Sequence, residues 1–285
     1  MKEETGYFSS FDGTKLFYRA LENDSPNALI IIHGIGEHSG RYHELIEALS
    51  ELPLSIFALD LRGHGHSEGD RVHINKFEDF VEDIYRFRAF ILDKKAGKQR
   101  NFILLGQSLG GLISTHVVLR SQDDWKKFIL LSPFFGLPFG FYFCCGLASL
   151  LNWLSPKRIW KNPIKPVFLT RDLEQVEIYK RDSLIQRQLT GCFANEMFKA
   201  VISAISRAKE ITIPLFILAS GSDFIVSTSK TKRFFNRVSS REKQIEVFEG
   251  CYHELLHELD RSKPIGMIKE YLQQCLTINL KTGRH

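Results

Sequence analysis

The segment 101–116, NFILLGQSLGGLISTH, constrains the fold of this chain more than any other stretch. Phe102 to Leu105 form an apolar run without alternation, which is typical of a strand buried on both faces. The run leads into the pattern G-x-S-x-G, whose glycines at 106 and 110 leave room for a tight turn. Apolar residues at helical spacing follow. A strand, a sharp turn and a helix would make Ser108 project from the end of a sheet as a candidate nucleophile. The pattern alone arises by chance in roughly one chain in ten of this length. The expected strand before it and helix after it are what make it informative.

Strands and helices are expected to alternate along most of the chain. Residues 6–20 read as a hairpin that turns at Asp12-Gly13. The expected strands are 27–32, 54–59, 102–105, 128–132, 213–219 and 244–248, and the expected helices are 43–49, 76–93, 228–238 and 264–276. This order predicts an α/β fold with a mostly parallel central sheet and helices on both faces. The sites of such sheets lie at the carboxyl ends of their strands.

One stretch stands apart from this alternation, because residues 132–156 contain no charged side chain. Its length would suit a membrane span, but prolines and glycines interrupt it and it follows directly on an expected core strand. An apolar lid over a site, or a surface that dips into lipid, is the favoured interpretation. We therefore expect a helical lid at 132–207, inserted between two parts of one α/β core at 1–131 and 208–285.

Composition limits the cellular context and the partners. The chain has 285 residues and a net charge of +5, without a block of basic residues interleaved with aromatics, so nucleic-acid binding is not expected. Five cysteines without framework spacing suggest free thiols in a reducing compartment. The first ten residues have no apolar core of the kind found in secretory signals. The cytoplasm is the expected location, with peripheral membrane contact as an option, and the oligomeric state is left open.

A serine nucleophile needs a base, and the base needs an orienting acid. In enzymes whose nucleophile lies on such a strand–turn–helix motif, these groups follow in the order Ser, Asp or Glu, His. Asp223 comes after the expected strand 213–219, and His253 comes after the strand 244–248. We predict Ser108, Asp223 and His253 as the catalytic residues. Capping of a turn or helix is the alternative role for Asp223.

His253 also begins a zinc-protease motif, H-E-x-x-H, that ends at His257. In that reading both histidines bind zinc and Glu254 activates water. The motif follows Gly250 at a strand end, whereas a zinc protease needs it inside a helix, and a third ligand at a recognised spacing is missing apart from Glu270. The histidines at 64, 66 and 73 share one glycine-rich loop and are interpreted as loop residues. No metal is expected.

An acyl-transfer site also needs two backbone donors for the oxyanion. One donor should be the amide of Leu109, which directly follows the nucleophile. The other should come from the loop after His33-Gly34, where the amide of Ile35 is the best placed.

Five motifs together resemble the monoglyceride lipase and lysophospholipase branch of the α/β-hydrolases. They are HGIGEHSGRY (33–42), LDLRGHGHSEG (59–69), GQSLGG (106–111), SGSDFIVS (220–227) and EGCYHELLHE (249–258). The resemblance implies Ser108 as nucleophile, Asp223 as acid, His253 as base, and Ile35 and Leu109 as oxyanion donors. It also implies that Glu37 and Arg41 lie near the polar head of the substrate, that 132–205 form a lid, and that no cofactor is needed.

The chain departs from that branch at three positions. Gln107 and Leu109 stand where the branch usually has His and Met, and neither replaces the nucleophile. His257 follows the expected base by four residues, where monoglyceride lipases have a histidine three residues on, so a glycerol-binding role is not transferred to it.

Three functions are consistent with the sequence. The first is a serine esterase of single-chain lipids, monoacylglycerols or lysophospholipids, whose apolar lid at 134–154 receives the acyl chain and leans on the membrane. The second is a related amidase, aminopeptidase or thioesterase, which the same three residues would also serve. The third is a non-catalytic binding protein on the same fold, which a lost catalytic residue would indicate.

Overall fold

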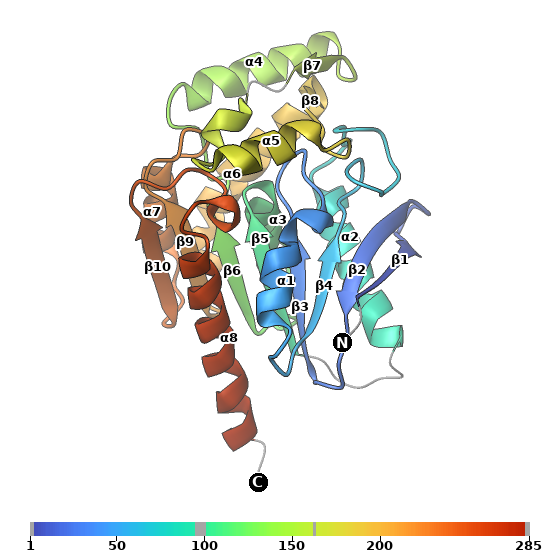
Figure 1. Ribbon diagram of the computed structural model, residues 1–285. Coiled ribbons are helices and arrows are strands. Elements are labelled where there is room, and N and C mark those ends of the chain that lie inside the picture. Colours follow the sequence, from blue (N-terminus) through green and yellow to red (C-terminus); the bar gives the residue numbers. More distant parts are fainter. Residues whose placement is uncertain (1–2, 95–100, 162–163, 283–285) are drawn as a thin grey trace.

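The central sheet of the computed structural model, which describes residues 3–94, 101–161 and 164–282, has eight strands (Figure 1). Their order across the sheet is β1 (Glu4–Ser9), β2 (Lys15–Leu21), β4 (Ser55–Leu59), β3 (Asn27–Ile32), β5 (Asn101–Gln107), β6 (Lys127–Leu131), β9 (Leu215–Ser220) and β10 (Lys243–Phe248). β1 and β2 form the antiparallel hairpin predicted around Asp12-Gly13, and β2 also pairs antiparallel with β4. The remaining pairs are parallel. The predicted α/β-hydrolase fold class is confirmed.

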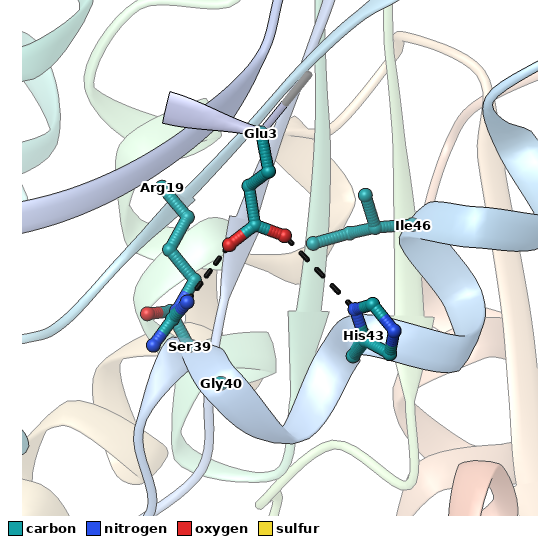
Figure 2. A pocket seen from close by; sticks show the side chains of 6 residues that line it. All are labelled: Glu3, Arg19, Ser39, Gly40, His43 and Ile46. Carbon is teal, nitrogen blue, oxygen red and sulfur yellow. Dashed lines mark hydrogen bonds and ion pairs between the residues drawn. The ribbon is translucent and has the colours of Figure 1, made fainter. Parts of the chain in front are cut away.

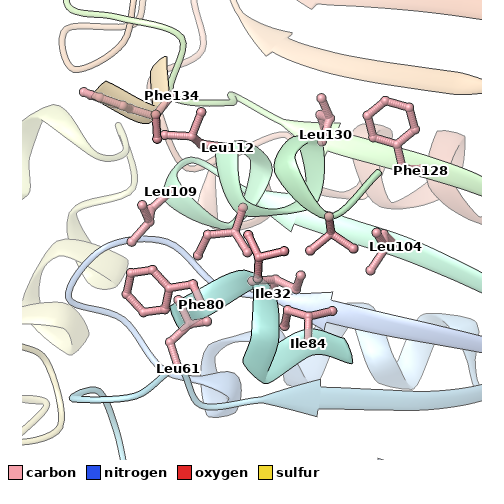
Figure 3. Packing of buried hydrophobic residues seen from close by; sticks show 14 of the residues in the cluster. Ile32, Leu61, Phe80, Ile84, Leu104, Leu109, Leu112, Phe128, Leu130 and Phe134 are labelled. Atoms are coloured by element: carbon pink, nitrogen blue, oxygen red, sulfur yellow. The ribbon is translucent and has the colours of Figure 1, made fainter. Parts of the chain in front are cut away.

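Helices cover both faces of the sheet because its central strands are apolar on both sides. On one face pack α2 (Glu78–Lys94), α3 (Leu109–Arg120) and α7 (Thr228–Arg237), and on the other pack α1 (His43–Leu49) and α8 (Ser262–Thr282). Side chains alternate between these two cores: Ile30 and Leu104 face α2 and α3, whereas Leu29 and Leu105 face α1 and α8. Figure 3 shows the first core, where Leu112 of α3 lies among residues from the strands and from α2.

The chain between β6 and β9 forms a layer beyond one end of the sheet (Figure 1). Its elements are α4 (Phe141–Leu154), β7 (Ile159–Lys161), a short 3₁₀ helix η2 (Pro166–Phe168), α5 (Leu173–Arg181), β8 (Gln188–Thr190) and α6 (Gly191–Arg207). β7 and β8 pair antiparallel, a contact that the sequence did not predict. α6 packs against both α3 and α4, so it links this layer to the core.

The predicted elements are present, several of them with shifted ends. α2 begins at Glu78 rather than at 76, β9 begins at Leu215 directly after Pro214, and α8 continues past 276 to Thr282. No helix in the described part of the chain is long and apolar enough to cross a membrane, and the uncharged stretch forms the short helix α4 instead.

Candidate active site

Ser108 lies on the sharp turn between β5 and α3, as the sequence predicts. Its backbone is in an unusual conformation for a residue with a side chain, with φ of 51° and ψ of −112°. The turn holds because the Ser108 amide donates to the Leu131 carbonyl at 2.9 Å. A Cβ at Gly106 would collide with the carbonyl oxygen of Gly110, and one at Gly110 would collide with that of Ile32. Both glycines are therefore required by close backbone approach, and Ser108 itself is only 3% exposed.

His253 and Asp223 form a buried pair at the same edge of the sheet. His253 Nδ1 lies 2.8 Å from Asp223 Oδ2, and both side chains are almost wholly buried. The other carboxylate oxygen of Asp223 accepts from the amides of Ile225 and Val226, each at 2.8 Å. This arrangement places the proton of the neutral imidazole on Nδ1 and leaves Nε2 as the acceptor. Burial lowers the pKa of His253, but the adjacent Asp223 carboxylate, together with the carboxylates of Glu254 and Glu37, more than offsets burial, so that the net pKa is raised.

Three hydrogen bonds hold the peptide groups on either side of His253. The Tyr252 amide donates to Glu258 Oε1 at 2.6 Å, and its carbonyl accepts from the Ser220 hydroxyl at 2.5 Å. The Glu254 amide donates to the carbonyl of Leu169, which comes from the layer above the sheet, at 2.8 Å. Residues 249–258, which we call the His253 loop, are thus held by β9, by their own Glu258 and by that layer. The sequence analysis missed Ser220 and Glu258, although both lie inside motifs that it quotes.

The two expected oxyanion donors border Ser108. Leu109 is the first residue of α3, and Ile35 follows Gly34, where a Cβ would lie 3.3 Å from the Ser108 Cβ. Among the hydrogen bonds of the described residues, neither the Leu109 amide nor the Ile35 amide donates to a protein acceptor. His33 fixes this loop: its Nε2 accepts from the Leu61 amide at 2.9 Å, and its Nδ1 donates to the Gly34 carbonyl at 2.7 Å. Burial lowers the pKa of His33 to about 3, so the ring stays neutral.

Glu37 and Arg41 lie in a buried polar cluster beside Ser108. A Cβ at Gly34 would lie 2.7 Å from Glu37 Oε1 and 3.3 Å from the Ser108 Cβ, so the Glu37 carboxylate lies near Ser108. Burial raises the pKa of Glu37 above its usual range, and the neighbouring Glu254 carboxylate raises it further. Arg41 Nη2 lies 2.5 Å from Glu254 Oε2, and its guanidinium stacks over the ring of Tyr179. Burial opposes ionisation of Glu254, but Arg41, His257 and His253 together outweigh burial and lower its pKa.

The H-E-x-x-H residues do not form the helical arrangement of a zinc protease. His253 pairs with Asp223, whereas His257 Nε2 donates to the Arg41 carbonyl at 3.0 Å. The only helical turn in the motif is the 3₁₀ turn η4 (Leu255–His257). Within the described ranges, no group of three or more histidine, cysteine or acidic side chains is arranged to hold a metal ion.

A separate small hollow lies between the N-terminal hairpin and the start of α1 (Figure 2). Arg19, His43 and the buried Ser39 line it, and the Glu3 carboxylate lies between the two basic side chains, 2.8 Å from Arg19 Nη1 and 4.0 Å from His43 Nδ1. None of its lining residues belongs to the predicted site, and its basic groups already face a carboxylate of the chain.

Comparison with known proteins places this geometry in a family. The family described as Serine aminopeptidase, S33 matches residues 24–260. The chain is 34% identical to the monoglyceride lipase of Homo sapiens over 254 residues, which cover 87% of this chain and 82% of that protein. The chain belongs to the monoglyceride lipase branch of the α/β-hydrolases.

Solved structures agree with that assignment. The monoacylglycerol lipase of Paleococcus ferrophilus superimposes with a TM-score of 0.81 at 26% identity, covering 95% of this chain and 98% of that one. A monoglyceride lipase of Saccharomyces cerevisiae, solved with a substrate analog, gives a TM-score of 0.86 at 19% identity, with 96% of both chains covered, which supports the fold alone. The family description names a peptidase, whereas these α/β-hydrolases are named as lipases. The comparisons therefore establish that the chain belongs to the monoglyceride lipase branch, and its substrate is inferred from the site itself.

Proposed function

We propose that this chain hydrolyses carboxylic esters of single-chain lipids, monoacylglycerols or lysophospholipids, through an acyl-enzyme on Ser108. The observation that carries the proposal is the strained turn at Ser108, which lies at the same sheet edge as the hydrogen-bonded pair of Asp223 and His253. Relatives named monoglyceride lipase support an ester substrate. The apolar α4 above the sheet supports a lipid chain rather than a peptide.

In the first half of the reaction, Ser108 Oγ attacks the ester carbonyl carbon while His253 Nε2 takes the hydroxyl proton. The negative charge that develops on the carbonyl oxygen is stabilised by the amides of Ile35 and Leu109. The intermediate then breaks its bond to the alcohol oxygen, and His253 returns the proton to that oxygen. Asp223 stabilises the imidazolium throughout without taking the proton itself.

In the second half, water replaces the alcohol. His253 Nε2 removes a proton from the water as its oxygen attacks the acyl carbon, and the same proton returns to Ser108 Oγ when the acyl bond breaks. The products are one fatty acid and one alcohol. Each turnover consumes one water and uses no cofactor.

Glu37 and Arg41 are the proposed neighbours of the polar head group. Both side chains are buried beside the Ser108 turn, and Glu37 offers an acceptor for a substrate hydroxyl. Ser108 is almost wholly buried, so part of residues 132–207, the proposed lid, must move before a lipid reaches it. The apolar part at 134–154 would then receive the acyl chain and touch the membrane surface.

Labelling with a fluorophosphonate probe tests the mechanism. We expect the wild-type protein to be labelled with or without a chelator, and Ser108→Ala to lose labelling and ester hydrolysis together. Intact esterase activity in Ser108→Ala would contradict the mechanism, and loss of labelling with the chelator would favour a metal-dependent enzyme. A panel of monoacylglycerols, lysophospholipids, peptides, amides and thioesters tests the substrate class. Faster turnover of peptides, amides or thioesters than of every lipid ester would replace esterase with the corresponding activity.

A further inference from the structure

The hollow between the N-terminal hairpin and the start of α1 contains more hydrogen-bond donors than its own residues satisfy (Figure 2). Its volume is about 130 Å³. Arg19 of β2, Ser39 and His43 line it with side chains that can donate, and Ile46 adds an apolar wall. Glu3 is the only acidic residue among those that line it. The chemistry of the hollow therefore favours a ligand that accepts hydrogen bonds and carries negative charge.

Two buried donor atoms of this hollow have no protein partner. Ser39 is only 1% exposed, and within the described part of the chain its Oγ makes no hydrogen bond. The same holds for Nε of Arg19, an atom that is buried although the side chain as a whole is partly exposed. Buried polar atoms in folded proteins are nearly always paired, so unpaired donors that border one hollow point to a ligand oxygen there.

The backbone beneath the hollow is held in place without using these donors. The Ser39 amide donates to Asp60 Oδ1 at 2.6 Å, and the Gly40 amide donates to His38 Nδ1 at 3.2 Å. A Cβ at Gly40 would lie 2.9 Å from the His38 ring and 3.4 Å from Arg19 Nη2. The missing side chain at position 40 thus lets the guanidinium approach the main chain closely. The donors converge on a site whose floor is already formed.

Glu3 occupies the hollow in the way that an anion would. Its Oε1 lies 2.8 Å from Arg19 Nη1, and its Oε2 lies 4.0 Å from His43 Nδ1. It nevertheless leaves Arg19 Nε and the Ser39 hydroxyl unpaired. A carboxylate has two oxygens in one plane, whereas a tetrahedral oxyanion has four oxygens that point in different directions and can accept from more donors. The Glu3 side chain is partly exposed and its residue lies just before β1, so it can turn outward without breaking the strand pairing.

We propose that this hollow binds a tetrahedral oxyanion, either phosphate or the phosphate group of a larger molecule. Arg19 and the Ser39 hydroxyl donate to its oxygens, His43 contacts it from the rim, and the Glu3 side chain turns outward as a tethered competitor. The largely exposed His43 leaves the hollow open on that side, so a group attached to the phosphate would extend into solvent. Ser108 takes no part in this site, so the proposal does not depend on the proposed function.

Titration of inorganic phosphate into the full chain tests the site, at constant ionic strength with chloride as the balancing anion. Binding is followed by calorimetry and by the NMR signals of the exposed His43 ring, which His43→Gln identifies. We expect saturable binding that shifts these signals. Arg19→Gln should weaken binding about tenfold or more, because a charged donor is lost, and Ser39→Ala should weaken it about fivefold.

Glu3→Gln provides the sharpest test. The substitution keeps the size of the side chain but removes the negative charge that competes with phosphate. We expect phosphate binding to become tighter by roughly tenfold. Misfolding cannot produce a gain of affinity, so this result does not depend on how well the weakened variants fold.

Arg88 and Asp124 provide a matched control pair. Arg88 is 22% exposed, against 25% for Arg19, and its Nη2 lies 3.0 Å from Asp124 Oδ1. Each of the two arginines also stacks on a phenylalanine ring, with the guanidinium carbon 5.0 Å from the ring centre for Arg88 and 5.5 Å for Arg19. The control pair does not line the hollow. Arg88→Gln and Asp124→Asn should therefore leave phosphate binding unchanged.

The absence of phosphate binding in both the wild type and Glu3→Gln would overturn the proposal. An equal gain in Asp124→Asn, or an equal loss in Arg88→Gln, would also overturn it, since phosphate would then respond only to the general charge of the protein. Phenyl phosphate distinguishes the two sources of the ligand. Binding as tight as that of phosphate supports a phosphate group carried by a larger molecule, whereas binding of inorganic phosphate alone supports the free ion.

Discussion

Two parts of the layer above the sheet differ sharply in how they are attached. The outer part, α4 and β7 at residues 141–161, exposes large apolar side chains and rests on α6 through small residues. The inner part, residues 164–172, is bonded directly to the His253 loop. Buried Thr170 donates its hydroxyl to the His257 carbonyl at 2.7 Å, and Arg171 Nε lies 2.9 Å from Glu258 Oε2. One part faces outward and the other supports the expected base.

This difference bears on how a lipid enters. Ser108 is buried, so part of the layer must move. Movement of the inner part would break the bond from the Glu254 amide to Leu169 and disturb the residue beside the base. We therefore expect the outer part to open while the inner part stays in place. The predictions that follow test this division, from residues that act on His253 to residues that only face outward.

The largest effect is expected at the direct partner of His253. Asp223→Asn keeps the shape but removes the charge that stabilises the imidazolium, and its amide disfavours the Nδ1 proton. We expect kcat to fall by a factor on the order of 10⁴ while the fold persists. Steady-state kinetics with a soluble ester and circular dichroism would check this. A loss smaller than tenfold would mean that Asp223 only caps the turn through the amides of Ile225 and Val226.

The pH dependence of the rate distinguishes the effect of the Asp223 charge on His253 from the effect of Arg171 on the position of His253. The raised pKa of His253 means that its imidazole takes up a proton at a higher pH than usual, so activity should fall as pH drops through that raised pKa. In Asp223→Asn, any residual activity should fall off only at a lower pH than in the wild type. The reason is that the Asp223 charge, which raises the pKa of His253, has been removed. Arg171→Ala should lower the maximal kcat/KM without shifting the pH at which the activity falls. The measurement is kcat/KM against pH for all three proteins, and a shift of that pH in Arg171→Ala would contradict a purely positional role.

The next effect concerns the ion pair between the inner part and the His253 loop. Arg171→Ala removes a donor from Glu258, whose other oxygen holds the Tyr252 amide. We expect kcat to fall about tenfold with KM nearly unchanged, because a small displacement of the base costs rate and not affinity. Fluorophosphonate labelling should slow by the same factor.

Lys269→Ala is the matched control. The Lys269 side chain on α8 is 28% exposed, against 31% for Arg171, and its Nζ lies 2.9 Å from Glu51 Oε2, in an ion pair that involves neither the His253 loop nor residues 164–172. Its rate should stay within about twofold of wild type, and Arg171→Lys should recover part of the lost activity. Equal losses in Arg171→Ala and Lys269→Ala would show that surface ion pairs stabilise the fold without positioning His253.

The sequence predicted what depends on local pattern and missed what depends on distant pairing. The strand 27–32 was predicted with its observed ends because every side chain in it is apolar or buried. Ser108, Asp223 and His253 could be proposed because each follows the carboxyl end of a strand in the sheet, and their catalytic roles stay predictions. The pairing of β7 with β8 could not be predicted, since strands of three residues carry no period. Nor could the bond from Arg171 to Glu258, since no local pattern joins residues so far apart.

The same limit applies to α4. Its composition showed an apolar segment, and the sequence favoured a lid or a lipid-facing surface over a membrane span. Which side of the helix would be buried was not predictable, because both sides are free of charge and the choice depends on the close approach to Gly191 of α6.

A smaller effect, on stability, is expected at Thr170. Thr170→Val keeps the shape but leaves the His257 carbonyl and the Asp172 amide without the hydroxyl that binds both. We expect the free energy of unfolding to fall by about 1–3 kcal/mol in urea titrations. Ser149→Ala is the counterpart in the outer part, where the exposed hydroxyl donates to Asn195 Oδ1 at 2.8 Å. Loss of this hydrogen bond should lower the free energy of unfolding by less than about 1 kcal/mol. Equal decreases in Thr170→Val and Ser149→Ala would contradict the distinction between the inner and the outer part.

The smallest effect is expected at Phe143. The side chain is 76% exposed, so Phe143→Ser removes little buried apolar surface, and the free energy of unfolding should change by no more than about 0.5 kcal/mol. The rate on a soluble ester should also stay unchanged, because Phe143 lies in the outer part and its side chain is mostly exposed. Urea unfolding and the soluble-ester assay check both values. A loss of more than about 2 kcal/mol, the size expected for a buried large-to-small substitution, would mean that Phe143 packs inward in solution, and the outer part would then belong to the core.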